Sequence, residues 1–132
     1  MKNMKKTILT ISLLGIALIS LGSDKTPWNV PDKNEKTINT TKSNAVSIAA
    51  GKILWTKYCE SCHGKTGLGD GKKASTLDTE PGNFSKAEIQ KQSDGSLCYK
   101  ITEGREDMPS FKKKITNNDI WNIVNFIRTL KK

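Results

Sequence analysis

Four side chains in this chain carry a thiol or an imidazole that can bind a metal or cofactor, and three of them lie within five residues. Cys59, Cys62 and His63 form a Cys-x-x-Cys-His motif, and Cys98 follows further along the chain. The chain has only 3 cysteines and 1 histidine. These positions therefore limit which metal or redox sites can exist.

The Cys-x-x-Cys-His spacing is the pattern of covalent haem attachment, in which two thiols add across the vinyl groups and the histidine ligates iron. Three other chemistries compete with it. A structural zinc site would need a fourth ligand, which only Cys98 could supply. A thioredoxin-like redox pair would need a βαβ context that the sequence lacks, and a disulfide between Cys59 and Cys62 would be strained. The motif favours haem over all three.

The motif is predicted to lie at the end of a helix that begins at Ala45. Apolar residues recur there at three- and four-residue steps, as in an amphipathic helix; they are Val46, Ala49, Ala50, Ile53, Leu54 and Tyr58. A capping box at Thr116–Asp119 predicts a second helix, whose apolar face holds Ile120, Ile123, Val124, Ile127 and Leu130. We expect these two helices to pack together.

The segment between these helices contains a glycine-rich loop, Pro81, Pro109 and a short helical pattern from Asp94 to Glu103. No alternating strand pattern is visible. With 132 residues and 35% hydrophobic content, the chain predicts one all-α domain with a small core. The same numbers exclude a multi-pass membrane protein.

Residues 1–22 read as an export signal, with lysines ahead of an apolar run from Ile8 to Leu21 and small residues after it. The run is shorter than the ~20 residues that usually span a bilayer, which favours cleavage over an uncleaved anchor. Residues 23–44 are polar and are predicted to be a flexible linker in which Trp28 is incidental. Residues 45–132 form the predicted domain, and we expect it in the periplasm, either soluble or tethered to the inner membrane.

Four ordered motifs resemble class I monohaem cytochromes c of bacterial type, over about residues 45–132. They are Gly51-x-x-Leu54-Trp55-x-x-Tyr58-Cys59-x-x-Cys62-His63-Gly64, Gly67-x-Gly69-Asp70-Gly71, Gly104-x-x-x-Met108-Pro109-x-Phe111 and Trp121-x-x-Val124-x-Phe126-Ile127-Arg128. The resemblance implies a small all-α fold whose first and last helices cross beside one covalently bound haem c. It also implies an electron carrier of the respiratory chain and not an enzyme.

Axial iron ligands can be assigned partly by elimination. His63 is the only imidazole, and Met108 is the only methionine that remains once Met1 and Met4 leave with the signal. A methionine is often a core residue without a ligand role, but the resemblance favours Met108 as the second iron ligand. It also implies that a proline carbonyl accepts a hydrogen bond from the proximal histidine, and Pro81 is the candidate by position.

The predicted chemistry is transfer of single electrons by an iron that cycles between Fe(III) and Fe(II). With both axial positions filled by His63 and Met108, the iron changes oxidation state without changing ligands, and its potential should be comparatively high. The alternative is a five-coordinate haem domain that binds a gas or reduces peroxide, which requires Met108 to be off the iron. A third hypothesis is a membrane-tethered haem module of a larger redox complex.

The formal charge of +9 is concentrated partly in lysines near the predicted loops: Lys72, Lys73, Lys86, Lys91, Lys112, Lys113 and Lys114. They form either a solvated face or a surface that steers the haem edge toward acidic redox proteins. We expect a monomer, with neither nucleic acid nor a small-molecule substrate as partner. Cys98 has no intramolecular partner, and its apolar neighbours Leu97 and Ile101 favour burial.

Overall fold

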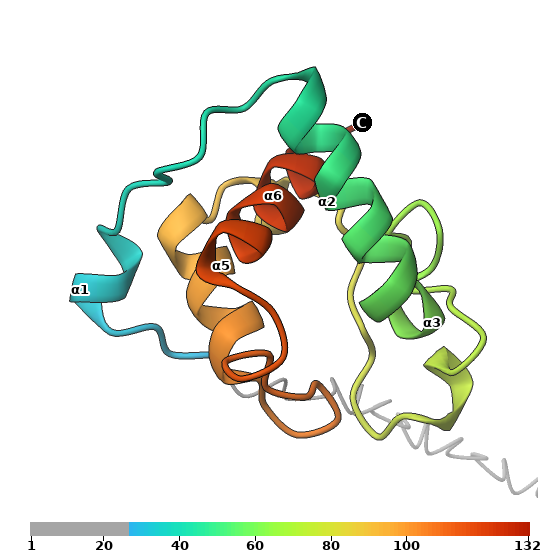
Figure 1. Ribbon diagram of the computed structural model, residues 1–132. Helices are drawn as coiled ribbons and strands as arrows, with labels where there is room; N and C mark the ends of the chain where they lie inside the picture. Colours follow the sequence, from blue (N-terminus) through green and yellow to red (C-terminus); the bar gives the residue numbers. More distant parts are fainter. Residues whose placement is uncertain (1–26) are drawn as a thin grey trace, which may run out of the picture.

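The computed structural model describes residues 27–132, and the predicted signal at 1–22 lies outside these residues. The helical elements are α1 (Asp32–Glu35), α2 (Ala45–Tyr58), α3 (Glu60–His63), η1 (Ala74–Thr76, a 3-10 turn), α4 (Ala87–Gln90), α5 (Asp94–Glu103) and α6 (Asn117–Arg128) (Figure 1). The described residues contain no β-strand. The predicted all-α class is confirmed.

Both long helices begin with a capping box, which satisfies backbone N–H groups that no helical carbonyl can reach. In α6, the Thr116 hydroxyl accepts from the Asp119 N–H at 3.1 Å, and the Thr116 N–H donates to the Asp119 carboxylate at 3.2 Å. In α2, Asn44 and Ser47 make the equivalent pair of bonds. The helices predicted from Ala45, from Asp94 and from Thr116 are all confirmed.

Helices α2 and α6 pack directly against each other, as predicted, and Figure 1 shows them side by side. They approach each other closely at Gly51, where an added Cβ would lie 1.9 Å from the Asn122 carbonyl oxygen and 2.9 Å from the Phe126 Cβ. One turn later, the Trp55 side chain is 1% exposed. A residue without a side chain and a large aromatic ring therefore together define this crossing.

The buried face of α2 differs from the face predicted by periodicity. Val46 and Ile53 are 79% and 70% exposed, whereas Ser47, Gly51 and Trp55 are buried. The periodicity gave weight to aliphatic residues, but a close helix crossing requires small ones. The helix was therefore predicted correctly and its core-facing residues only in part.

Helix α5 packs between α6 and the N-terminal segment and completes the core. Cys98 is 8% exposed, which confirms its predicted burial. The Arg128 guanidinium donates to the Asp94 carboxylate at 2.6 and 2.8 Å and to the carbonyls of Gln90 and Gln92 at 3.0 and 2.6 Å. The C-terminal end of α6 is thus fixed to the N-terminal end of α5.

Residues 28–41, which we call the N-terminal strap, are ordered against the helices, unlike the flexible linker predicted for 23–44. The Ser93 hydroxyl donates to the Glu35 carbonyl at 2.6 Å, and the Asn39 amide donates to Asn125 and Asp94 at 2.9 and 3.1 Å. Gly95 lets the strap approach, since a Cβ there would lie 2.1 Å from the Asn34 carbonyl. The polar composition of this segment predicted a solvated tether. The prediction was wrong because the hydrogen-bond partners of these polar residues lie far away in the sequence. Among the described residues, no helix is long and apolar enough to span a membrane.

Replacing Gly51 with alanine should destabilise the protein, because the new methyl group would push α2 away from the Asn122 carbonyl. We expect Gly51→Ala to lower the free energy of unfolding by roughly 1–3 kcal/mol. Denaturant unfolding of the holoprotein measures this. The control, Thr56→Ala at an exposed position of the same helix, should change stability by less than ~0.5 kcal/mol. A Gly51→Ala protein as stable as the wild type would contradict the close crossing.

Candidate cofactor site around the Cys-x-x-Cys-His motif

The three chemical side chains of the motif lie on one helical turn. Helix α3 follows α2 almost directly: the Cys59 N–H donates to the Trp55 carbonyl at 2.8 Å, and the His63 N–H donates to the Cys59 carbonyl at 2.9 Å. Cys59 is 9% exposed, and Cys62 and His63 are partly buried. The packing of α2 against α6 therefore determines where both thiols and the imidazole lie.

The glycine-rich loop after His63 folds back onto this turn. The Gly69 N–H donates to the His63 carbonyl at 2.9 Å, and the Gly71 N–H donates to the Cys62 carbonyl at 3.2 Å. Gly71 must lack a side chain, since a Cβ there would lie 2.5 Å from the Ser61 carbonyl oxygen. The loop thereby occupies the C-terminal carbonyls of α3 and holds the motif rigid.

Two aromatic rings enclose the imidazole. The centroid of His63 lies 5.6 Å from that of Trp55 and 5.0 Å from that of Phe84, and Phe84 meets it edge to face. The Trp55 indole is fixed by donating to the Gly64 carbonyl at 3.0 Å. Sequence analysis did not identify Phe84. The loop after the motif folds back at this point, and the Phe84 N–H donates to the Gly67 carbonyl at 2.7 Å. No spacing in the local sequence indicates such a contact.

The surroundings of His63 favour its neutral form, which is the form that ligates metals. Burial lowers the pKa of His63, and the backbone of Pro81 opposes this in part as a hydrogen-bonding group. The Nδ1 atom is itself buried and makes no hydrogen bond of standard geometry with any described residue. The backbone of Pro81 therefore lies near the imidazole.

The surroundings of Cys59 favour neutral sulfur over a thiolate. Burial, with a smaller contribution from nearby Cys62, raises the pKa of Cys59 to about 12. Reactive redox cysteines need a lowered thiol pKa, whereas a thioether carries no charge and can be buried without penalty. The third cysteine, Cys98, lies on α5, where its Sγ contacts Asn117. Among the residues that the structure describes, no three His, Cys, Asp or Glu side chains form a metal-ligand group.

Met108 lies in a closed turn of four residues. Arg105 and Met108 exchange two backbone hydrogen bonds of 2.8 and 2.9 Å. Gly104 precedes this turn with φ of +69°, and a Cβ there would lie 2.5 Å from the Met108 carbonyl oxygen. Met108 is partly buried and packs against the core, and Phe111 behind it is 5% exposed. The turn therefore directs the thioether inward.

The Met108 turn is also joined to the loop that carries Pro81. The Thr79 N–H donates to the Asp107 carboxylate at 2.9 Å, and the Thr79 hydroxyl donates to the Glu106 carboxylate at 2.7 Å. Glu106 has φ of +53°, a left-handed conformation that is uncommon for residues other than glycine. These bonds hold the methionine turn and the proline loop in a fixed relation.

The residues fit haem c by their chemistry. A partly buried imidazole whose surroundings favour the neutral form suits a haem axial ligand, and two thiols three residues apart on one turn suit thioether attachment. Met108 adds a soft sulfur donor that is packed against the same core. Such a donor set can hold iron in one coordination geometry through a change of oxidation state.

Comparison with known proteins also supports a haem c protein. A family model described as "Cytochrome C oxidase, cbb3-type, subunit III" matches residues 46–127. A curated relative, cytochrome c6 of Rippkaea orientalis (strain PCC 8801 / RF-1), is 28% identical over 90 residues, which cover 67% of this chain and 75% of the relative. The N-terminal strap lies outside the residues that the family model matches.

Several solved structures share the fold. The KustC0563 c-type cytochrome is 33% identical with a TM-score of 0.56, covering 62% of this chain and 98% of its own. A chain of the Kuenenia stuttgartiensis reducing HAO-like complex has a TM-score of 0.63 at 23% identity, covering 73% of this chain, which spans half of that one. Cytochrome CL of Methylophaga aminisulfidivorans MPT has a TM-score of 0.54 at 21% identity, covering 85% of this chain and 72% of that one. The last two show the fold alone.

Thioether attachment and the burial of Cys98 predict how many thiols the loaded protein exposes. A thiol reagent should find no reactive thiol in the native holoprotein and one per chain after unfolding, because burial both shields Cys98 and raises its pKa. Titration with a chromogenic disulfide before and after adding denaturant measures this. A Cys98→Ser variant should give no thiol in either state. Three thiols after unfolding would mean that Cys59 and Cys62 are not attached to a haem.

Proposed function

We propose that this chain, a member of the cytochrome c family described as cbb3-type cytochrome c oxidase subunit III, is an electron carrier with a six-coordinate haem c. Family membership confirms a class I monohaem cytochrome c with covalently bound haem, and the function is haem c electron transfer. The assignment of individual residues, partners and location is our proposal. In this proposal, the chain holds the haem by thioethers from Cys59 and Cys62, with His63 and Met108 as axial ligands.

When bound, haem c supplies a one-electron Fe(III)/Fe(II) couple. The observation that carries the proposal is the partly buried imidazole of His63, whose surroundings favour the neutral form, beside two thiols on one turn. Trp55 and Phe84 fix the plane of the imidazole and keep water away from it. Little protein rearrangement is then needed when an electron enters or leaves.

We assign Met108 as the second axial ligand because its turn is closed and its side chain packs inward. A thioether ligand and an apolar environment both favour the ferrous state and raise the potential. Pro81 serves as the hydrogen-bonding partner that orients His63. With both axial positions occupied, oxygen and peroxide have no coordination site, which is why we propose an electron carrier and not an enzyme.

The proposed docking surface for redox partners includes Lys112, Lys113 and Lys114. These lysines line a shallow groove with Tyr58, the residue before Cys59, so they lie next to the attachment motif. Their positive charge would attract an acidic surface on a reductase or oxidase and speed the encounter. We further propose an exported, periplasmic protein, soluble or held at the inner membrane through the segment ahead of Trp28.

Removing the Met108 sulfur should open the sixth coordination position. The wild-type ferrous protein should not react promptly with carbon monoxide, whereas Met108→Leu, which keeps the side-chain volume, should bind it and show a shifted spectrum. Its reduction potential should fall by on the order of 0.1 V, within the ~0.8 V range that axial ligands control. Ser110→Ala, in the same loop, is the control. Prompt binding by the wild type would favour the gas-binding or peroxide-reducing alternative.

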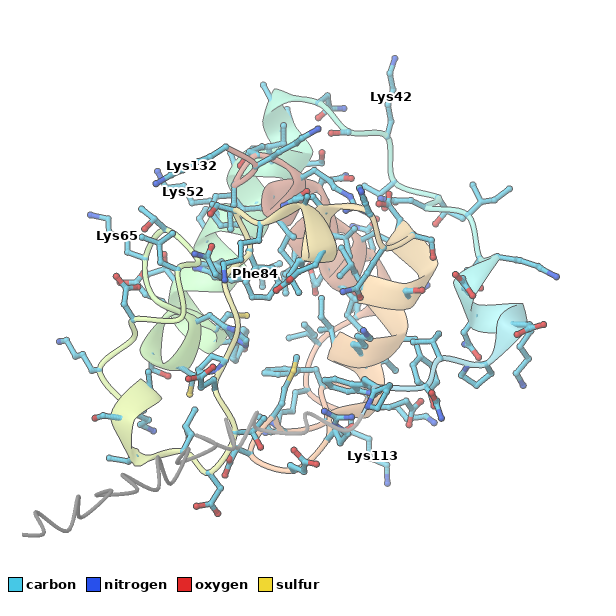
Figure 2. The ribbon with its side chains drawn as sticks, turned by 180° about the vertical axis from the view of Figure 1, so that it is seen from behind. Lys42, Lys52, Lys65, Phe84, Lys113 and Lys132 are labelled. Atoms are coloured by element: carbon cyan, nitrogen blue, oxygen red, sulfur yellow. The ribbon has the colours of Figure 1, made fainter. Side chains whose placement is uncertain are left out.

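Charge at Lys112–Lys114 should control the rate with an anionic oxidant. Figure 2 shows Lys113 at one end of the molecule and Lys42, Lys52 and Lys65 toward the opposite end. Replacing lysines 112–114 with glutamine should slow oxidation by ferricyanide by about tenfold at low salt. The same change at lysines 42, 52 and 65 removes equal charge and should have a much smaller effect. Equal effects of the two variants would place the electron-transfer edge elsewhere.

A further inference from the structure

The N-terminal strap contacts the methionine side of the site through one aromatic residue. The Trp28 ring lies under two cations: the Arg105 Cζ is 4.7 Å from its centroid and the Lys100 Nζ is 5.5 Å away. Both distances are within the range of cation–π attraction. Lys100 belongs to α5, and Arg105 begins the Met108 turn, so Trp28 joins the two elements.

The two cations that meet at Trp28 repel each other. Burial lowers the pKa of Lys100, and the positive charge of Arg105 lowers it further. Lys100 is held in place by donating to the Gln92 side chain at 2.7 Å. The electron-rich face of the indole offsets the repulsion, so that Arg105 can stay beside α5.

The position of Arg105 directly affects the position of Met108. Their backbones are joined by two hydrogen bonds, so a shift of Arg105 moves the residue that we assign as an iron ligand. On the other side of the turn, Thr79 holds Glu106 and Asp107. The methionine turn is therefore held between the proline loop and the strap.

We propose that Trp28 is a positioning residue for Met108, and that the strap determines how firmly the thioether stays on the iron. The inference rests on the proposed His63/Met108 coordination and extends it to a segment outside the residues that the family model matches. The strap can act at this distance because it is docked on α5 through Ser93 and Gly95. Loss of the indole would remove its attraction for Arg105 and Lys100, and the turn would open more often.

The test uses the full holoprotein and measures carbon monoxide binding to the ferrous form, together with the weak red absorption band of methionine on ferric haem. Trp28→Ala should raise the carbon monoxide association rate about fivefold, as expected for losing one cation–π contact, and weaken the red band. Trp28→Phe keeps a ring face and should lie closer to the wild type. Ile38→Ala, at a strap residue that is 81% exposed, should behave as the wild type.

Arg105→Gln provides a second variant that leaves the strap sequence intact. Arg105→Gln removes the contact with Trp28, the repulsion from Lys100 and the 3.8 Å ion pair with Glu106 together, so its own rate does not isolate the indole. Adding Trp28→Ala to it should cause no further rise in the rate, because the contact is already gone. Additive effects, or a wild-type rate in Trp28→Ala, would overturn the role of Trp28. If Met108→Leu itself left carbon monoxide binding unchanged, the coordination proposal would fail instead, so the two failures are distinguishable.

Discussion

The structure depends on the contact between α2 and α6 at Gly51. The absence of a side chain there lets the Asn122 backbone approach, and Trp55 then packs one turn further along against Phe126. Because α2 runs almost directly into α3, this crossing also determines the position of Cys59 and His63. Trp55 belongs to both parts, since it packs in the helix interface and contacts the imidazole. Stability and cofactor geometry are thus set by the same few residues.

Electrostatics and packing act in the same direction at the site. Burial that lowers the pKa of His63 and raises that of Cys59 favours the uncharged forms, which are those that haem ligation and thioether attachment use. An apolar surrounding that would penalise thiolate chemistry is therefore suited to a covalently attached porphyrin. The exposed lysines carry the positive charge on the outside, where it can act on a partner without destabilising the interior.

Features encoded in short stretches of sequence could be predicted, whereas those that depend on distant contacts could not. The capping box at Thr116–Asp119 and the Cys-x-x-Cys-His spacing are local, and they gave the helices and the cofactor. The face of α2 was predicted only in part, because its neighbour selects small residues. Phe84 and the docking of the strap were missed, since Phe84 meets His63 through a loop and Asn39 meets Asn125 across most of the chain. Residue types alone do not reveal such pairs.

The two hydrogen bonds of Thr79 have a consequence for local unfolding. They join the loop before Pro81 to the turn that contains Met108, so neither segment can swing away from the core without releasing the other. These bonds therefore couple the opening of the two segments, so that their opening free energies are not independent. A transient opening would loosen the Met108 turn and the Pro81 loop together, so a fluctuation in one of them also removes support from the other.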